Sequence, residues 1–407
     1  MKTSRRSFAH AVAGGGAAFA AALAPSLASA NTPGARIRKV EVLPTALEFR
    51  SAFNIGVGSV GGKGEPGKHV FVKIETEEGQ TGWGATNTVP NWSYETVEAV
   101  VGTLEHHLAP LAIGRTAFEW NVLKKQMDEK IRPAVSNGAP FAKSALEIAF
   151  LDLAGKMAGQ PIHKLLGGKL HNTIDLCYAV SIDEPEAMAD EVKRWPACRC
   201  FKVKVAGDAD KDLARLRAIS EARPDIVIWL DANQSYQPIA LERFLHALPE
   251  FKNIRCFEQP VRSEDWIGLA RAREKSPYPL AIDEGCFSSF DVARMARIDA
   301  ADLVVLKVSK SGGVTNCYKS AVVAEANGLG LLGSGLTDAG VSFTAAIHLY
   351  ATLDLLLPPE LNGPQFLTDM MVDGLAINGA TVTVPDQPGL GITVPEDRVR
   401  ANRLKLG

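Results

Sequence analysis

The sequence predicts an α/β protein, a modified (β/α)8-type barrel that carries an α+β domain, called the capping domain below after the role that a family resemblance implies for it. Between residues 170 and 370, short apolar runs alternate with helix-like segments such as 208–222 and 238–248. Several runs end in a charged residue, and these charges follow one another every 24–27 residues. That interval is the length of one strand plus one crossover helix. Eight such units close into a barrel whose catalytic groups lie at the carboxyl ends of the strands.

The N-terminus predicts an export signal over residues 1–30. Arg5-Arg6 is followed by an apolar run rich in Ala and Gly that ends in Ala28-Ser29-Ala30. Paired arginines, low hydrophobicity and a small-residue cleavage site are typical of a twin-arginine signal, although an apolar N-terminal helix is the alternative. The expected location is therefore the periplasm, reached after folding, with no membrane anchor once the signal is removed.

The remainder divides into a capping domain, residues 31–168 plus 371–407, and a barrel over 169–370. The net charge of −2 gives no basic footprint for nucleic acid, and the 46% hydrophobic content is enough for a large core. The chain has six cysteines. An exported chain could form a disulfide, but Cys177 and Cys256 fall in predicted strands and Cys198-Arg199-Cys200 lacks partners at zinc spacing. We expect free thiols.

The capping domain is predicted to begin with a strand over 36–50. Residues 51–68 follow with six glycines, which indicate either a mobile surface loop or a lid over a substrate. Val70–Thr76 and Thr81–Gly84 read as the two strands of a hairpin. Helical periodicity then covers 94–108, 118–131 and 140–158.

The first barrel strand is expected at 174–180 and the seventh at 330–334. The eighth has no clear pattern within 352–366, so the barrel is expected to be modified or incomplete. Short alternating segments at 376–377, 380–384 and 392–394 cannot extend a parallel barrel, and we expect them to fold back onto the N-terminal domain.

Three carboxylates end consecutive predicted strands, namely Asp231, Glu258 and Asp283. Neighbouring strands lie about 4.8 Å apart, so these groups converge and would repel one another without a cation. Oxygen ligands alone favour a hard ion, Mg²⁺ first and Mn²⁺ next. The alternative is a set of ion pairs with Lys204 and Lys307.

The lysines predict proton transfer. Lys202 and Lys204 lie on the second strand and Lys307 on the sixth, so they face each other across the mouth of an eight-strand barrel. A lysine beside a dication and another lysine can act as a neutral base. Two such lysines could remove the α-proton of a carboxylate from one face and return it to the other. Lys310 is expected to be a surface loop residue.

In this order and spacing, the motifs resemble those of the enolase superfamily, specifically the muconate lactonizing enzyme-like (Lys-x-Lys) subgroup of the mandelate racemase relatives. The resemblance covers residues 36–395 and rests on Lys202-Val203-Lys204, Asp231-Ala232-Asn233, Glu258-Gln259-Pro260, Asp283-Glu284-Gly285 and the segment 307–313. It implies that the three acids bind Mg²⁺, that Lys204 and Lys307 are the acid/base pair, and that Lys202 neutralises the substrate carboxylate. It also implies that the glycine-rich and Trp83 loops close over the substrate.

The sequence departs from the family where substrate identity is decided. Ala85 stands where the family usually has an acidic residue, and the loop after the seventh strand offers Thr337 or Asp338 in place of a glutamate. The expected substrate contacts are Lys202, Asn233, Trp83, Phe53 and Asp338. Asp338, Asp369 and Asp373 could receive an ammonium group, although such acids are more often solvated loop residues.

The predicted function is Mg²⁺-dependent abstraction of an α-proton through a metal-stabilised enediolate. A racemase or epimerase of an amino-acid-like or cyclic imino-acid substrate ranks first. Dehydration of a hydroxy acid such as a hydroxyproline-like compound, or cycloisomerisation, comes next. A Schiff-base aldolase and a solute-binding protein are the alternatives outside the family. A homo-oligomer is expected.

Overall fold

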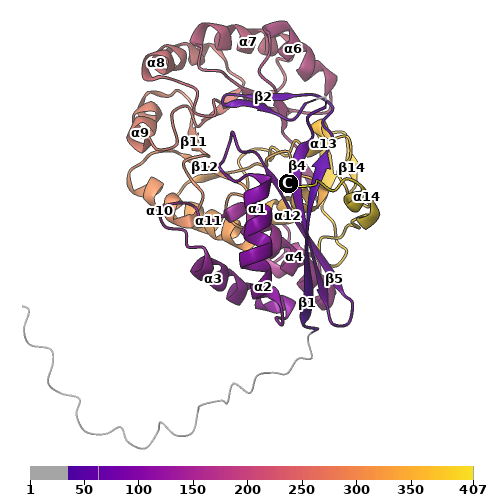
Figure 1. Cartoon of the computed structure of the whole chain (residues 1–407). Helices are drawn as coiled ribbons and strands as arrows, with labels where there is room; N and C mark the ends of the chain where they lie inside the picture. The colour runs from indigo at the N-terminus through magenta and orange to yellow at the C-terminus, as the bar shows by residue number, and fades with distance from the viewer. Residues whose placement is uncertain (1–34, 63, 407) are drawn as a thin grey trace, which may run out of the picture. The chain divides into compact units, whose positions relative to one another are not determined.

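A wholly parallel sheet of seven strands curls into most of a barrel (Figure 1). The computed structural model describes residues 35–62 and 64–406; the predicted signal at 1–30 lies outside the described residues. Each strand is followed by its own crossover, so the spatial order of the strands is also their order in the chain. The strands are β7 (Tyr178–Val180), β8 (Cys200–Lys204), β9 (Val227–Asp231), β10 (Ile254–Glu258), β11 (Leu280–Ile282), β12 (Leu303–Leu306) and β13 (Gly330–Gly333).

Helices cover the outside of this sheet, as the sequence period predicts. Their starts carry ordinary cap signals: Asp208 accepts the N–H of Lys211, Pro238 occupies a first-turn position, and Ser288 and Asp291 form a capping box. The helices are α6 (Pro185–Arg194), α7 (Ala209–Ala222), α8 (Pro238–Ala247) with η3 (Leu248–Glu250), α9 (Trp266–Lys275), α10 (Ser289–Arg297), α11 (Val314–Ala326) and α12 (Gly340–Tyr350).

The eighth barrel position holds no strand within the described residues. Glu360 makes single parallel bridges to Cys177 and to Ser334, and the short helix α13 (Gly363–Phe366) follows it. The seam between β7 and β13 is therefore closed by isolated contacts, which confirms the incomplete barrel.

The predicted strand over 174–180 is divided in two, which corrects the sequence analysis. Its first half, β6 (Thr173–Asp175), leaves the barrel and pairs with β15 (Thr381–Thr383), which in turn pairs with β14 (Ile377–Asn378). The tail strands were expected on the N-terminal domain, and that expectation was wrong for these two. Later parts of the tail do reach that domain. Gly389 bridges Pro161, the Leu390 N–H donates to Asp152, α14 (Glu396–Ala401) contacts β1 and Arg403 bridges Thr45.

The capping domain is an antiparallel sheet packed on helices. Its three strands are β1 (Ile37–Leu47), β4 (Gly67–Thr76) and β5 (Thr81–Thr88), in the order β1-β4-β5. The helices are α1 (Val97–Thr103), η1 (Leu104–Leu108), α2 (Ala109–Ala112), η2 (Ala117–Glu119), α3 (Trp120–Lys130), α4 (Pro140–Ala158) and α5 (Ile162–Leu165).

Helix α4 contacts elements of both domains and is buried from Pro140 to Gly155. It contacts β5 on one side and α11 and α12 of the barrel domain on the other. Gly84 and Gly82 permit the contact with β5, because a Cβ at these positions would lie 1.9 Å from the carbonyl oxygen of Ala145 and 2.3 Å from that of Ala149. The Gly-Trp-Gly motif therefore serves close packing in a strand, not a substrate loop.

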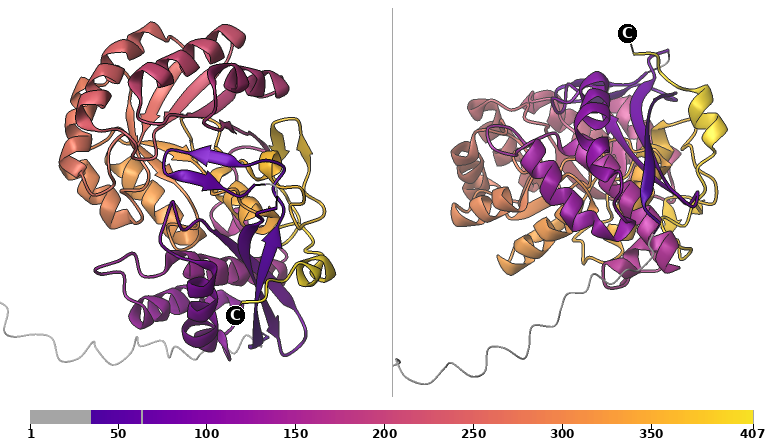
Figure 2. Two further views of the ribbon diagram at one scale, coloured as in Figure 1. Left: turned by 45° about the horizontal axis from the view of Figure 1, so that its top comes forward. Right: turned by 60° about the horizontal axis from the view of Figure 1, so that its bottom comes forward.

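The glycine-rich segment forms a short hairpin across the mouth of the barrel (Figure 2). Its strands are β2 (Phe53–Ile55) and β3 (Gly58–Val60). Asn54 binds the barrel through its N–H to the Ser181 hydroxyl, at 2.8 Å, and accepts the N–H of Ile182, at 3.0 Å. This placement favours the lid over the mobile surface loop.

Two further expectations can be compared with the structure. All six cysteines fall within the described residues and are buried free thiols. Across the described part of the chain, none of the helices combines the length and the apolar character needed to cross a bilayer.

Candidate active site

The predicted charged residues meet at the carboxyl ends of the strands. Lys204 pairs laterally with Asp231, and Asp231 with Glu258, in the register of β8, β9 and β10. Asp283 directly follows β11. Each of these three carboxylates is 0% exposed. Because parallel strands present their ends at the same edge, the βα repeat alone is enough to bring the acids together.

Four lysines bind these acids. Lys202 Nζ lies 2.9 Å from Glu258 Oε1 and 3.0 Å from Asp231 Oδ2. Lys204 Nζ lies 2.6 Å from Asp231 Oδ2, and Lys307 Nζ lies 2.6 Å from Asp283 Oδ2. The expected ion pairs and the expected convergence of acids are therefore both present.

Lys310 corrects the sequence analysis. It was expected on the surface, but it is 2% exposed and its Nζ binds Asp283 twice, at Oδ1 (2.6 Å) and at the carbonyl oxygen (2.8 Å). A lysine three residues after Lys307 thus fixes the backbone as well as the carboxylate of Asp283.

The buried acids of the site differ in the direction in which their pKa values are shifted. Burial by itself would raise the pKa of Asp231 and of Asp283, but the neighbouring lysines hold both below their ordinary values. For Glu258, burial and then the charge of Asp231 raise the pKa well above its ordinary value. Burial followed by the charge of Asp283 raises the pKa of Glu284 to about 7. The site therefore holds more buried acid than its lysines neutralise.

This surplus fits a divalent cation. Glu258, Asp283 and Glu284 each offer a carboxylate oxygen, and these oxygens all lie within 4.8 Å of one another. Among the described residues, Oε2 of Glu258 and Oε2 of Glu284 are buried without a hydrogen-bond partner. Hard oxygen donors of this kind suit Mg²⁺. Asp231 stands outside this group, and its Oδ2 binds Lys202 and Lys204. Glu284 belongs to the group but was not predicted as a ligand.

The two proposed bases approach from opposite walls of a pocket. Lys204 comes from β8 and Lys307 follows β12, four strands away in the sheet order. Lys204 Nζ lies 5.6 Å from the ring centroid of Phe53, and Lys307 Nζ lies 4.0 Å from that of Trp92. Each base is thus covered by an aromatic ring from the capping domain.

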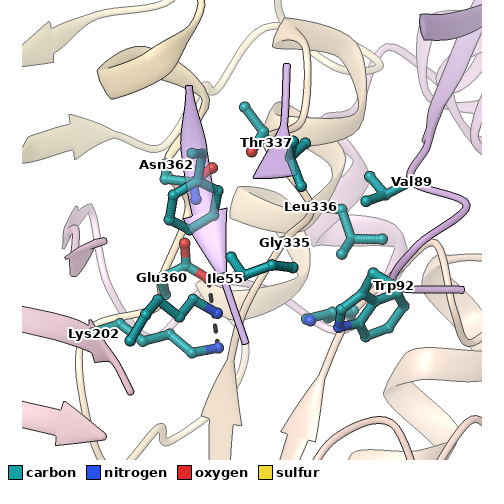
Figure 3. A pocket seen from close by; sticks show the side chains of 13 residues that line it. Ile55, Val89, Trp92, Lys202, Gly335, Leu336, Thr337, Glu360 and Asn362 are labelled. Carbon is teal, nitrogen blue, oxygen red and sulfur yellow. Dashed lines mark ion pairs between the residues drawn. The ribbon is translucent and has the colours of Figure 1, made fainter. Parts of the chain in front are cut away.

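The pocket between these lysines combines residues of both domains (Figure 3). In the close-up, Lys202 and Glu360 lie at one side and Trp92 and Val89 at the other. The capping domain contributes Phe53, Ile55, Val60, Val89 and Trp92, and the barrel contributes Lys202, Lys204, Lys307, Gly335, Leu336, Thr337, Glu360 and Asn362.

Three of the expected substrate contacts lie at this site. Lys202 and Phe53 line the pocket directly. Asn233 is 1% exposed and lies behind them: its Oδ1 accepts from Lys204 Nζ at 3.0 Å and its Nδ2 donates to Glu284 at 2.9 Å. Asn233 thus orients a base and is poorly placed to touch a substrate.

Trp83 and Asp338 do not line the pocket. Trp83 lies in β5, where its N–H donates to Asp152 at 2.8 Å, and the pocket tryptophan is Trp92. The Asp338 carboxylate turns back to accept the N–H of Leu336 at 3.1 Å, so it shapes the loop and leaves Thr337 at the pocket.

Asp369 and Asp373 lie elsewhere. Both pair with Arg398, at 3.4 Å and 2.6 Å respectively, and neither lines the pocket. The alternative reading, that they are solvated loop acids, fits these contacts better than a role in binding an ammonium group.

Glu360 and Asn362 are pocket residues that sequence reasoning missed. Glu360 Oε2 accepts from the Ser334 hydroxyl at 2.8 Å and lies 3.8 Å from Lys202 Nζ. Within the described chain, Glu360 Oε1 and Asn362 Oδ1 are buried and have no hydrogen-bond partner. An acidic residue directly after Pro358-Pro359, where the eighth strand should end, was the available signal.

Comparison with known proteins assigns both domains of the chain to one family. The N-terminal domain model of the mandelate racemase/muconate lactonizing enzyme family matches residues 37–167, and the enolase C-terminal domain-like model matches residues 187–398. A curated relative, N-succinyl-L-Arg/Lys racemase of Bacillus cereus, is 31% identical over 371 residues, which cover 90% of this chain and 97% of the relative.

Solved structures of the same family have the same fold over most of this chain. Muconate lactonizing enzyme from Pseudomonas fluorescens, complexed with muconolactone, superposes with a TM-score of 0.86 at 27% identity, over 91% of this chain and 100% of that one. A dipeptide epimerase from Enterococcus faecalis, complexed with Mg and the dipeptide L-Leu-L-Tyr, gives a TM-score of 0.81 at 29% identity, over 88% of this chain and 99% of the other.

Proposed function

Because the chain belongs to the mandelate racemase/muconate lactonizing enzyme family of the enolase superfamily, we propose that it is a Mg²⁺-dependent racemase or epimerase. Its substrate is an amino-acid-derived carboxylate whose α-proton is removed and returned. The observation that carries the proposal is the position of Lys204 and Lys307, which line one pocket from strands that lie four apart. A single base would suffice for exchange with retention, whereas inversion needs a group on each face.

The lysines divide the work. Lys204 Nζ takes the α-proton from one face while Lys307 Nζ supplies a proton to the other, and their roles exchange for the reverse direction. Lys202 stays a cation: burial alone would lower the pKa of Lys202, but Asp231 and Glu258 raise it well above its ordinary value. Lys202 thereby pairs with the substrate carboxylate instead of accepting a proton.

Glu258, Asp283 and Glu284 would hold the Mg²⁺ ion, or Mn²⁺ in its place. Asp231, the other predicted ligand, would have to give up a lysine contact to join them. When bound, the ion neutralises the charge that builds on the substrate carboxylate as the α-proton leaves. The E. faecalis relative with bound Mg and the unpartnered oxygens of Glu258 and Glu284 support this assignment.

The substrate is proposed to be an N-acylated amino acid or a dipeptide. The B. cereus and E. faecalis relatives are named for substrates of these kinds. The pocket itself supports a substrate with N–H or O–H donors, because Glu360 Oε1 and Asn362 Oδ1 are buried acceptors that need them.

The test is solvent deuterium exchange over both enantiomers of an N-acyl amino-acid and dipeptide library, with and without a chelator. We expect label at the α-carbon together with inversion, and loss of both on chelation. Label with retention only would overturn the racemase assignment, and release of water would favour a dehydratase.

A cycloisomerase is the second candidate, because the P. fluorescens muconate lactonizing enzyme superposes on this chain with a TM-score of 0.86. Muconate ring closure removes a conjugated system, so loss of ultraviolet absorbance identifies it. Turnover of muconate without α-proton exchange on amino-acid derivatives would favour this second function.

We further propose that the enzyme acts in the periplasm, on the strength of the Arg5-Arg6 signal pattern. Fractionation of cells that express the full chain tests this. An Arg5→Lys, Arg6→Lys variant should stay in the cytoplasmic fraction.

A further inference from the structure

We propose that Glu147 is a positioning residue for Lys307, a carboxylate of the capping domain that fixes the backbone of a barrel lysine. This inference rests on the proposed function, in which Lys307 serves one face of the substrate. Glu147 itself touches neither the pocket nor the acids described above.

Glu147 caps the start of α11 from another domain. It lies on α4 and is 0% exposed. Its Oε2 accepts the N–H of Val314 at 2.6 Å, and its Oε1 accepts the N–H of Thr315 at 3.1 Å and the Thr315 hydroxyl at 2.5 Å. The first N–H groups of a helix have no partner inside it, so both oxygens satisfy groups that α11 leaves open.

Gly313 makes room for this carboxylate. It is the N-cap residue of α11, with φ +128°, and has no side chain to cap the helix itself. A Cβ at Gly313 would lie 2.3 Å from Glu147 Oε2. The barrel therefore supplies an open helix end and the capping domain supplies the missing cap.

The charge of Glu147 is balanced locally. Lys124 of α3 donates to the Thr315 hydroxyl at 2.5 Å, so a cation of the capping domain lies beside the same helix end. Together with the positive end of the α11 dipole, Lys124 offsets part of the cost of burying the carboxylate, but burial still raises the pKa of Glu147 above its ordinary value.

A tight turn transmits the position of α11 to Lys307. Gly313 lies only six residues after Lys307. The intervening backbone is closed by hydrogen bonds from Ser311 N–H to the Lys307 carbonyl (3.2 Å) and from Gly313 N–H to the Val308 carbonyl (3.0 Å). A displaced helix start would therefore shift Lys307, and a misplacement of about 1 Å can slow a reaction by about a hundredfold.

The other base does not depend on Glu147. The turn after Lys204 is held by Asp212 of α7, which accepts the N–H groups of Ala206 and Gly207, each at 3.0 Å. Glu147 should accordingly affect one face of the reaction and not the other, which a general loss of stability would not do.

The experiment isolates each face. In a Lys204→Met enzyme only Lys307 can exchange the α-proton, and in a Lys307→Met enzyme only Lys204 can. We add Glu147→Gln, which keeps the size of the side chain, to each background and measure deuterium incorporation. We expect a loss of about tenfold with Lys307 as the working base and less than about twofold with Lys204. Equal losses in the two backgrounds, or no loss, would overturn the inference.

Asp152→Asn is the matched control. Asp152 is a second buried carboxylate of α4, but it accepts the N–H groups of Trp83 and Leu390, both at 2.8 Å, away from α11. This variant should lower the stability of the protein. It should leave unchanged the ratio of the deuterium incorporation rates in the Lys204→Met and Lys307→Met backgrounds.

A second measurement does not need turnover. Amide hydrogen exchange of the 307–316 segment should rise in Glu147→Gln, while the 204–212 segment stays as in the wild type; unchanged protection of 307–316 would count against the inference. Absence of α-proton exchange in the wild-type enzyme would instead overturn the proposed function, and with it the reason for positioning Lys307.

Discussion

The two lysine-bearing turns of the barrel solve the same problem with different parts of the chain. After Lys204, the open N–H groups are accepted by Asp212, six residues from Ala206 on the helix that the turn itself begins. After Lys307, they are accepted by Glu147, 167 residues away from Val314 in the chain. One base is fixed by its own βα unit and the other by the docking of a second domain. The capping domain therefore contributes to the placement of one catalytic group besides covering the pocket.

The aromatic covers do not follow this division, because both come from the capping domain. Phe53 over Lys204 comes from the β2–β3 hairpin, whereas Trp92 over Lys307 comes from the segment between β5 and α1. A change in how the capping domain sits would reach the Lys307 side through both Trp92 and Glu147. The following predictions test this asymmetry.

The largest effect is expected from removing a base. Lys204→Met and Lys307→Met should each lower racemisation by about a thousandfold or more, since each face needs its own proton carrier. Each variant should still exchange the α-proton of one enantiomer, and the two should retain opposite ones. Chiral chromatography after incubation in deuterated water measures both. If the two variants retain the same enantiomer, the lysines do not serve opposite faces.

Removal of the metal should affect both bases alike. Glu258 and Asp283 bind Lys202 and Lys307 respectively, so the cation site lies between the two halves of the pocket. A chelator should lower exchange by about a hundredfold or more in both single-lysine enzymes, and added Mg²⁺ should restore it. If a chelator abolished exchange in only one of the two single-lysine enzymes, the ion would serve only the lysine that remains in that enzyme.

Asp212→Asn should produce the mirror image of Glu147→Gln. It should slow exchange by about tenfold when Lys204 is the working base and little when Lys307 is. Asp212 also pairs with Arg215 at 2.8 Å, so the variant should lose about 3 kcal/mol of unfolding free energy. Urea denaturation measures the second effect and a Lys204-only exchange assay the first. An equal effect on both bases would remove the contrast between the turns.

The smallest effect concerns pH and the Trp92 side of the pocket. Glu95 accepts the N–H of Phe141 at 3.0 Å, and burial raises the pKa of Glu95 from 4.5 to about 7. The folded protein therefore binds this proton more tightly than the unfolded chain. Its contribution to stability is complete below pH 4.5 and is lost as the pH rises through about 7.

Glu95→Gln should abolish this dependence of the unfolding free energy on pH. The difference between wild type and variant in unfolding free energy should change by about 3 kcal/mol between pH 4.5 and pH 8. Urea titrations at several pH values measure it. A constant difference across this range would show that Glu95 keeps its ordinary titration.

The sequence was sufficient for what the βα period controls. Asp231, Glu258, Asp283 and Lys307 each follow an apolar strand, and parallel strands bring their ends to one edge whatever the loops do. The bounds of α4 were also predictable, because Pro140 starts the helix and Gly159, with φ +63°, ends it.

What the sequence could not give depends on contacts between distant segments. Trp83 lies in β5 and Trp92 follows that strand, so the sequence offers both as pocket residues. Only the packing of Gly82 and Gly84 on α4 shows that Trp83 belongs to the core. Glu360 was missed because no strand marks the eighth position. Glu147 reads as one of several polar residues in a mostly apolar helix until α11 is placed against it.

The seam between β7 and β13 has a consequence for how this scaffold can change. It is spanned by the two bridges of Glu360 and by single backbone hydrogen bonds such as that from the Leu356 N–H to the Leu331 carbonyl (2.9 Å), in place of the continuous ladders between the other strands. A bulkier or longer substrate tail could be admitted there by shifting a few side chains, with the acids and lysines left in register. Changes in substrate specificity would then be made most easily at the seam between β7 and β13, with little effect on the acids and lysines at the other strand ends.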